Sequence, residues 1–406
     1  MSKIIYMDNN ATTKVAPEVF EEMRPYFCEL YGNPSSMHSF GGQVGHVVEE
    51  ARLRVARLIN AEPEEIIFTS CGTESDSTAI FSALQSKPEK RHVVTSRVEH
   101  PAVKNLCENL DNLTGHKHKV TQLPVDEEGM LDMEQYRESL SDDTAIVSMM
   151  WANNETGVLF PIAEMAAIAR QRGILFHTDA VQAVGKIPID VKKVAVDFLS
   201  ISGHKLHAPK GTGVLYVRKG TPFAPFLIGG HQEQGRRGGT ENVTSIIGMG
   251  KACVLAGHYI EKENSTVRLL RDKLEQGLLA TIPNAMRNGH KTERLPNTAN
   301  ISFEYVEGEA ILLHLDRFGI CASSGSACTS GSLEPSHVLR AMGVPFTAAH
   351  GSIRFSLSVY NTEEEVDYIL EKLPPIIADL RQMSPFWEDR AKIAGGGSCG
   401  SCSCKK

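Results

Sequence analysis

Short apolar runs recur along the first half of the chain, and amphipathic segments separate several of them. The stretch 43–60 places Val44, Val48, Val55 and Ile59 on one stripe with helical spacing. The apolar runs predict strands at 65–70, 92–96, 145–152, 174–180, 197–202 and 213–217. Strands that are apolar almost throughout and that alternate with helices are typical of a buried, mostly parallel sheet covered by helices. The pattern therefore predicts an α/β fold.

The pattern changes near residue 260. Beyond it, the spacing predicts a helix at 267–282, two strands in the runs TANISF and SIRFSL, and a last helix that starts with a capping box of Thr362 and Glu365. The closing run GGGSCGSCSCKK has the composition of a flexible linker. We therefore predict a large domain over 16–260, a smaller α+β domain that combines 1–15 with 261–393, and a tail over 394–406.

Composition narrows the classes of protein. The 406 residues are 41% hydrophobic and 22% charged, which is ordinary for a globular chain. The formal net charge is −7 and no long basic run occurs, so nucleic acid is not expected as the main partner. No apolar run approaches the length that spans a membrane, and MSKIIYMDNNATT lacks the apolar segment of a signal peptide. Nine cysteines, an odd number, indicate reduced thiols, and we expect a cytoplasmic protein.

Two predicted strands end in residues that can hold an aromatic cofactor. Lys205 follows the strand 197–202 at a Ser-Gly-His turn, where a lysine can form a Schiff base, although most lysines are plain surface residues. Asp179 ends the strand 174–180, where its carboxylate could pair with a pyridinium nitrogen or cap a helix.

Two further positions complete this set. Gly72 and Thr73 follow the strand 65–70 and open a helix, which suits a phosphate group, although simple capping is the alternative. His100 precedes a proline, where its imidazole could stack on a flat ring or simply be structural. An amine, an anion, a phosphate-binding site and an aromatic ring that can stack on a cofactor together indicate pyridoxal phosphate (PLP) chemistry.

The motifs in combination resemble those of a known family. YMDNNATT, HTDAVQAVGK, SGHKLHAPKG, RRGGTEN and SSGSACTSGSLEPSHVL resemble the cysteine desulfurases of the NifS type, which are class-V aminotransferase-like enzymes of PLP fold type I. The resemblance covers the chain except the tail. It implies a large domain with a mostly parallel sheet between helices and a smaller α+β domain. It also implies conversion of L-cysteine to L-alanine, with the sulfur transferred to an enzyme cysteine as a persulfide.

The resemblance also implies roles for single residues. Lys205 would form the covalent link to PLP, Asp179 would pair with the ring nitrogen, and Gln182 would bind the ring hydroxyl. The other implied roles are ring stacking and proton transfer for His100, phosphate binding for Gly72, Thr73, Ser202 and His204, contact of Thr240 with the partner subunit's cofactor in a homodimer, and binding of the substrate carboxylate by Asn154 and Arg354.

Cys328 lies in CASSGSACTSGS, a run of small residues without helix or strand periodicity. The resemblance identifies Cys328 as the nucleophile that takes the sulfur. A glycine- and serine-rich loop suits a thiol that must reach the substrate and then an acceptor protein, and a lowered pKa or a base such as His100 would make it reactive. Cys321 follows an apolar run, and we read it as a spectator.

The tail carries Cys399, Cys402 and Cys404 with CxxC spacing. Metal or iron–sulfur binding and persulfide relay are the functional hypotheses for these thiols, and an iron–sulfur contact is a further hypothesis for Cys328. Three cysteines do not complete a four-thiolate site, so the sequence favours a tail without a specific role. No metal is expected in the core of the protein.

Three other functions are alternatives to this assignment. A selenocysteine lyase would use the same residues, whereas an aminotransferase needs no mobile thiol, and a non-catalytic sulfur- or metal-binding protein needs no cofactor site. The resemblance suggests an iron–sulfur scaffold protein of the NifU type as the sulfur acceptor. Whether the sulfur serves nitrogen fixation, general iron–sulfur cluster assembly or another thiolation pathway is not encoded in these motifs.

Overall fold

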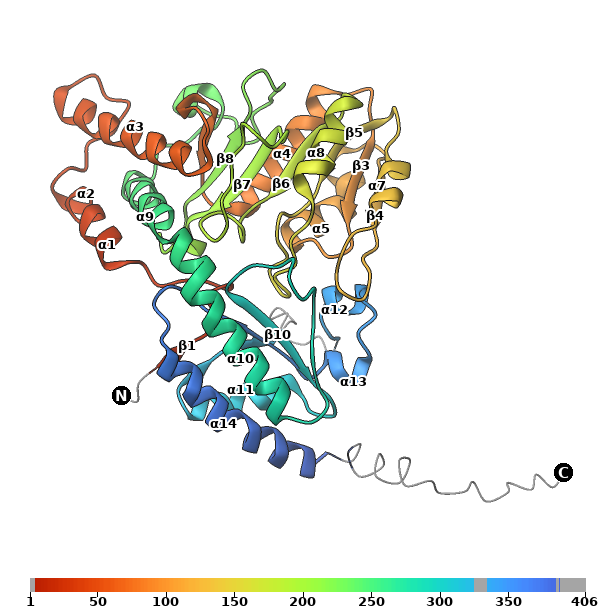
Figure 1. Cartoon of the computed structure of the whole chain (residues 1–406). Helices are drawn as coiled ribbons and strands as arrows, with labels where there is room; N and C mark the ends of the chain where they lie inside the picture. The colour runs from red at the N-terminus through yellow and green to blue at the C-terminus, as the bar shows by residue number, and fades with distance from the viewer. Residues whose placement is uncertain (1–3, 325–333, 385–386, 388–406) are drawn as a thin grey trace.

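The computed structural model describes residues 4–324, 334–384 and 387. The upper half of the molecule is built on a seven-stranded sheet with the order β2-β8-β7-β6-β5-β3-β4 (Figure 1). Only β8 runs antiparallel to its neighbours within this sheet, and the other pairs are parallel. The strands are β2 (Ile66–Thr69), β3 (His92–Ser96), β4 (Lys119–Leu123), β5 (Thr144–Ser148), β6 (Leu175–Asp179), β7 (Phe198–Ser202) and β8 (Gly213–Val217).

The sheet confirms the predicted α/β class. All six strands predicted from apolar runs are present, although the run 145–152 leaves the sheet after Ser148. The edge strand β4 was not predicted, because only Leu123 of its five residues is buried and its sequence KVTQL contains no apolar run. Periodicity detects strands buried on both faces and misses an edge strand with partly exposed side chains.

Helices cover both faces of the sheet. Neighbouring residues alternate between the faces: Ile67 packs under α4 (Gly72–Ser86) and α5 (Pro101–Glu108), whereas Ile66 and Phe68 pack in the core of the opposite face. The longer helices of that opposite core include α1 (Pro17–Met23), α3 (Ser39–Ile59), α8 (Ile162–Gln171) and α9 (Val243–Lys262). With both faces covered, the carboxyl edge of the sheet is left to form a site.

A second, separate apolar core lies in the lower half of the molecule (Figure 1). Its elements are an antiparallel sheet of order β12-β13-β10-β9, the parallel pair of β1 and β11, and three helices. The bounds are β1 (Ile5–Tyr6), β9 (Ala285–Arg287), β10 (Thr298–Phe303), β11 (Ile320–Cys321), β12 (Ser323–Ser324), β13 (Ser352–Ser356), α10 (Arg268–Thr281), α11 (Gly308–Arg317) and α14 (Glu363–Gln382). The predicted capping box is confirmed at the start of α14, where Thr362 and Glu365 bond reciprocally.

One helical run joins the two parts. α9, a π-helical turn at Glu263–Val267 and α10 follow one another without a loop, so the predicted boundary at residue 260 lies inside a helix. The run Val243–Thr281 is long and apolar enough, by length and composition alone, to span a membrane. Its buried residues, however, pack against α3, α1 and the lower core, as expected of a core helix.

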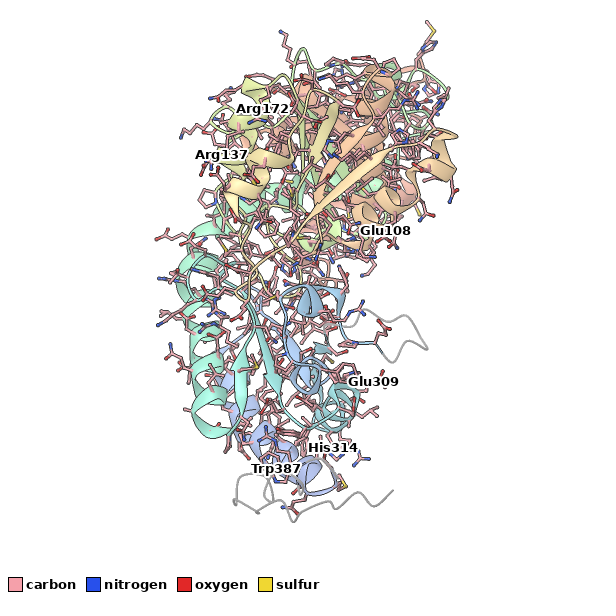
Figure 2. All side chains as sticks on the ribbon, turned by 90° about the vertical axis from the view of Figure 1, so that its right-hand side faces the viewer. Glu108, Arg137, Arg172, Glu309, His314 and Trp387 are labelled. Carbon is pink, nitrogen blue, oxygen red and sulfur yellow. The ribbon has the colours of Figure 1, made fainter. Side chains whose placement is uncertain are left out.

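The side view in Figure 2 separates the two parts of the molecule clearly. The helices not yet described are short. Figure 2 shows Glu108, Arg137 and Arg172 around the large sheet, and Glu309, His314 and Trp387 on the lower part. The short helices are α2 (Pro25–Cys28), α6 (Leu110–Thr114), α7 (Met133–Ser139), α12 (His337–Ala341) and α13 (Phe346–Ala349), with 3-10 turns at Pro63–Glu65, Gly203–Lys205 and Gln232–Gly235.

Candidate active site

A cavity of about 430 Å³ lies where the carboxyl ends of β6 and β7 meet the lower part of the molecule. Most of the residues predicted for the site line it: Gly72, Thr73, His100, Asn154, Asp179, Gln182, Ser202, His204, Lys205 and Arg354. Asp8, Asn10 and Ala11 from the start of the chain line it as well. We call the side formed by β6, β7 and α4 the sheet wall, and the side formed by β13 and residues 8–11 the lower wall.

Lys205 lies at the end of the 3-10 turn that follows β7. Its Nζ donates to the carbonyl oxygens of Asn10 at 2.6 Å and Ala11 at 2.7 Å. Burial, and after it the positive charge of Arg354, lowers the pKa of Lys205 to about 7. A large fraction of this amine is therefore neutral near pH 7, as a nucleophilic lysine requires.

Asp179 is the last residue of β6, and its Oδ1 accepts a hydrogen bond from the Val181 N–H at 2.9 Å. Burial raises the pKa of Asp179 to about 6. The carboxylate is therefore mostly ionised at neutral pH, and it can pair with a cationic ring nitrogen.

Two polar atoms at the carboxyl ends of β6 and β7 are buried without a hydrogen-bond partner among the described residues. They are Gln182 Oε1 and Ser202 Oγ. The amide nitrogen of Gln182 is used, since it donates to the Asn10 carbonyl at 3.0 Å. A buried polar atom without a partner costs about 1–3 kcal/mol, so these atoms fit a polar ligand that satisfies them when it binds.

The start of α4 supplies an anion-binding site beside these atoms. Its N-cap residue, Cys71, makes no side-chain cap bond, so the first N–H groups of the helix depend on another acceptor. A Cβ on Gly72 would lie 2.9 Å from Val181 Cγ2 and 3.5 Å from Ser202 Cβ. A glycine here therefore lets the helix start pack closely against the strand ends, with Thr73 at the cavity.

The two histidines at the cavity are held in place and are neutral. His100 caps α5, its Nδ1 accepting from the Ala102 N–H at 3.2 Å, so the capping role coexists with a place in the cavity wall. His204 Nδ1 lies 3.2 Å from Thr12 Oγ1. Burial lowers the pKa of both imidazoles, that of His204 to about 4. A neutral imidazole can accept a proton or donate a neutral hydrogen bond.

Arg354 comes from β13 in the lower part of the molecule and reaches the cavity from the side opposite the sheet. Its Nη2 donates to Asp8 Oδ1 at 2.8 Å and its Nη1 donates to the Asn154 carbonyl at 3.0 Å. Its Nε is buried without a partner among the described residues. The guanidinium is thus fixed in orientation and retains a donor for a carboxylate ligand.

Thr240 is one predicted residue that the fold does not bring into this cavity. It is exposed in the loop before α9, and it is absent from the cavity lining. The loop is attached to α4 through Arg237, whose Nε donates to Glu74 Oε1 at 3.0 Å. A contact of Thr240 with a partner subunit remains a prediction.

The predicted cysteine chemistry lies beyond the described chain. Cys328, Cys399, Cys402 and Cys404 fall outside the described residues. The described chain reaches the cavity at Ser323 and Ser324 of β12, and Ser323 pairs with Arg354. The cysteines of the described part are unpaired thiols, as the sequence predicted: Cys28, Cys71, Cys107, Cys253 and Cys321.

Several cavity residues received no role from the sequence. Asp8, Asn10 and Ala11 belong to the motif YMDNNATT, but a rule based on strand ends cannot indicate that the start of the chain reaches this edge. Asp76 lies one helical turn after Thr73, and this spacing is the available signal that it faces the same cavity.

Comparisons with known proteins identify the family to which the chain belongs. The aminotransferase class-V family model matches residues 5–369. The cysteine desulfurase NifS of Azotobacter vinelandii is 60% identical over 394 residues, which are 97% of each chain. A solved NifS-like protein is 39% identical with a TM-score of 0.86, covering 93% of this chain and all of that one. A structure described as SspA in complex with cysteine is 33% identical, with a TM-score of 0.77 and coverage of 88% and 100%.

Proposed function

The chain belongs to the aminotransferase class-V family and is a cysteine desulfurase, and we propose that its reaction takes place in the cavity between the sheet wall and the lower wall. Enzymes of this family use PLP. The substrate is cysteine, and the reaction transfers its sulfur. The single observation that carries the proposal is the meeting of Lys205, Asp179 and Arg354 at one cavity.

The sheet wall fits PLP. Asp179 offers a carboxylate to the ring nitrogen, and the buried atoms of Gln182 and Ser202 offer hydrogen bonds that they do not make within the described protein. The start of α4 at Gly72 and Thr73 and the nearby His204 would hold the phosphate, while His100 would lie against the ring. When bound, PLP supplies an electron sink for the charge left on the substrate carbon.

Lys205 has two tasks in this proposal. It would hold PLP covalently before the substrate arrives, and its freed Nζ would then take the proton from the substrate α-carbon. Its pKa of about 7 suits both, since general-base catalysis is most effective when the pKa lies near the working pH. The carbonyls of Asn10 and Ala11 accept from Nζ and would orient the amine between these tasks.

Arg354 and Asn154 would bind the substrate at its carboxylate. The guanidinium offers a planar, charged donor set, with Nε free among the described contacts. Asn154 already fixes this arginine through its carbonyl oxygen, so its side chain is left for the substrate. Holding the carboxylate on the lower wall would place the cysteine side chain in the cavity, whose lining includes Ser323 and Ser324.

Cys328 would complete the sulfur transfer. Its thiolate sulfur would attack the substrate sulfur, a sulfur–sulfur bond would form, and the bond from sulfur to the substrate β-carbon would break. The electron pair of that bond stays with the substrate carbon skeleton, which is protonated and leaves as alanine. His100 lies at the cavity in its neutral form, and because its Nδ1 accepts from the Ala102 N–H, its Nε2 would carry the hydrogen that it donates in proton transfer.

The proposal extends to the surroundings of the enzyme. We place it in the cytoplasm as a homodimer in which Thr240 reaches the cofactor of the partner subunit. The sulfur acceptor would be an iron–sulfur scaffold protein of the NifU type. The exposed position of Thr240 outside its own cavity supports the dimer.

The test is to mix the purified protein with L-cysteine and a reductant and to assay alanine and sulfide together. Wild type should give the two in equal amounts, whereas Cys328→Ser should keep bound PLP and lose both products. Cys321→Ser is the matched control and should behave as wild type, since Cys321 lies in β11 and pairs with Tyr6. Normal sulfide release by Cys328→Ser would refute its role. Turnover of selenocysteine alone would identify a selenocysteine lyase.

A further inference from the structure

A row of polar side chains crosses the buried face of the sheet beneath the cavity. Ser148, His177 and Ser200 lie on the adjacent strands β5, β6 and β7, and each is fully buried. His177 Nδ1 lies 2.8 Å from Ser148 Oγ, and its Nε2 lies 3.0 Å from Ser200 Oγ. Burial of polar groups costs free energy even when they are paired. Three hydrogen-bonding side chains in a buried sheet therefore call for a functional explanation.

Strand alternation places this row directly below the residues of the sheet wall. His177 precedes Asp179 by two residues, and Ser200 precedes Ser202 by two, so each pair points to the same face. The same face carries an apolar layer one step further from the cavity, made of Ile146, Leu175 and Phe198. The polar row thus separates the apolar core under α4 from the floor of the cavity.

Asp76 of α4 completes the row. It is 1% exposed, and its Oδ1 lies 3.5 Å from His177 Nε2. This oxygen has no hydrogen-bond partner among the described residues, and Asp76 also lines the cavity. Two buried carboxyl groups, Asp76 and Asp179, therefore face one small region. Ionisation of both would cost free energy, because the two negative charges would repel each other.

We propose that Asp76 is a positioning residue that holds a proton in the row of Ser200 and His177, so that a single negative charge, on Asp179, faces the cofactor ring. The inference rests on the proposed function because it takes Asp179 as the partner of the ring nitrogen. It assigns the proton to a fixed position beneath the floor of the cavity, where Asp76 acts through Asp179 and does not touch the substrate.

The hydrogen bonds of the two carboxyls support this order of ionisation, because Asp179 Oδ1 accepts from the Val181 N–H at 2.9 Å, whereas Asp76 Oδ1 has no hydrogen-bond partner among the described residues. Burial raises the pKa of both carboxyls, that of Asp76 to about 7 and that of Asp179 to about 6. Burial lowers the pKa of His177 to about 4, so the ring supplies no positive charge to Asp76. The other titratable groups whose charges couple to these two carboxyls are Glu99, His100 and Lys205.

The first measurement is infrared spectroscopy of the cofactor-free protein across pH, comparing wild type with Asp76→Asn and Asp179→Asn. The carboxylic acid band lost in Asp76→Asn should be present in wild type at neutral pH and should titrate at higher pH than the band lost in Asp179→Asn. Ser75→Ala, a buried uncharged neighbour on α4, is the control and should keep both bands. A missing Asp76 band, or the reverse order of titration, would overturn the proposal.

The second measurement is the affinity for PLP as a function of pH. Asn reproduces a protonated Asp76, so Asp76→Asn should keep the acid-side midpoint of wild type. A charged Asp76 would hold the pKa of Asp179 up, so a downward shift of that midpoint in Asp76→Asn also overturns the proposal. Unchanged PLP affinity in Asp179→Asn would instead refute the cofactor assignment in the proposed function, and the infrared order of the two carboxyls would still stand on its own.

Discussion

The two walls of the cavity differ in how their polar groups are satisfied. The sheet wall keeps Gln182 Oε1, Ser202 Oγ and Asp76 Oδ1 buried without partners among the described residues. On the lower wall, Arg354 already bonds to Asp8 and to the Asn154 carbonyl, and among the described residues only its Nε is left without a partner. A wall with unsatisfied atoms suits a group that stays bound, whereas a wall with its own internal partners suits a small substrate that binds and leaves.

Lys205 connects the two walls. It lies at the end of a strand of the large sheet, yet its Nζ contacts the carbonyls of Asn10 and Ala11, and its pKa is lowered partly by Arg354. The position and the pKa of the catalytic amine therefore depend on residues of both walls. Variants of each wall test whether the two walls have these separate roles.

The largest effect is expected from Lys205→Ala. Loss of the general base should lower kcat by about 10²–10⁴-fold and remove the visible absorption of covalently held PLP. Alanine production and the absorption spectrum are the measurements, with Lys210→Ala, an exposed neighbour, as the control. Multiple turnovers at the wild-type rate in Lys205→Ala would contradict its assignment.

Arg354→Ala tests the lower wall. Hydrogen bonds to charged groups are worth about 1.5–3 kcal/mol, so KM for L-cysteine should rise by roughly 10–150-fold with a smaller change in kcat. PLP affinity, measured by absorbance, should change less than KM because the sheet wall is intact. An unchanged KM would show that another group holds the substrate carboxylate.

The same variant has a second, smaller expected effect through Lys205. The neutral amine reacts with PLP, so the rate of PLP uptake by the cofactor-free protein should rise with pH through about 7. Without the positive charge of Arg354, the pKa of Lys205 should be higher, and the midpoint of the uptake profile should move to higher pH. A midpoint at the wild-type pH would mean that the two walls are electrostatically independent.

Asp8→Asn should have the smallest effect, and it should lower KM for L-cysteine, whereas Arg354→Ala should raise it. Asp8 competes with the substrate carboxylate for Arg354, and partly exposed ion pairs are worth about 0.2–1 kcal/mol. Removal of this charge should therefore lower KM for L-cysteine by up to about fivefold. A rise in KM would instead show that Asp8 orients Arg354 more than it competes with the substrate.

Much of the cofactor side was predictable from the sequence, because strand ends are local features. The apolar runs before Asp179 and Lys205 identified two strands, and parallel strands bring their carboxyl ends to one edge. Gly72 and Thr73 were predictable for the same reason, since they open the helix that follows a strand. The edge strand β4 was missed because its side chains are only partly buried.

The remaining parts of the site depend on contacts between distant segments. Asp8 lies 346 positions from Arg354, and Asn10 lies 195 positions from Lys205, yet each pair is in contact. No periodicity or local spacing encodes such pairs, because they follow from the packing of the lower sheet and the chain start against the edge of the large sheet. The polar row beneath Asp179 could not be predicted from the sequence either, because three strands and α4 each contribute one residue to it.

The class of fold, the strand ends that carry Lys205 and Asp179 and, through the motifs, the likeness to cysteine desulfurases all follow from the amino-acid sequence. Which atoms of the cavity are satisfied, which pKa values are shifted, and that Asp76 lies in the same buried region as Asp179 become evident in the folded molecule. Hydrophobic periodicity is encoded locally along the chain, whereas burial and electrostatic coupling arise when segments far apart in sequence exclude water together.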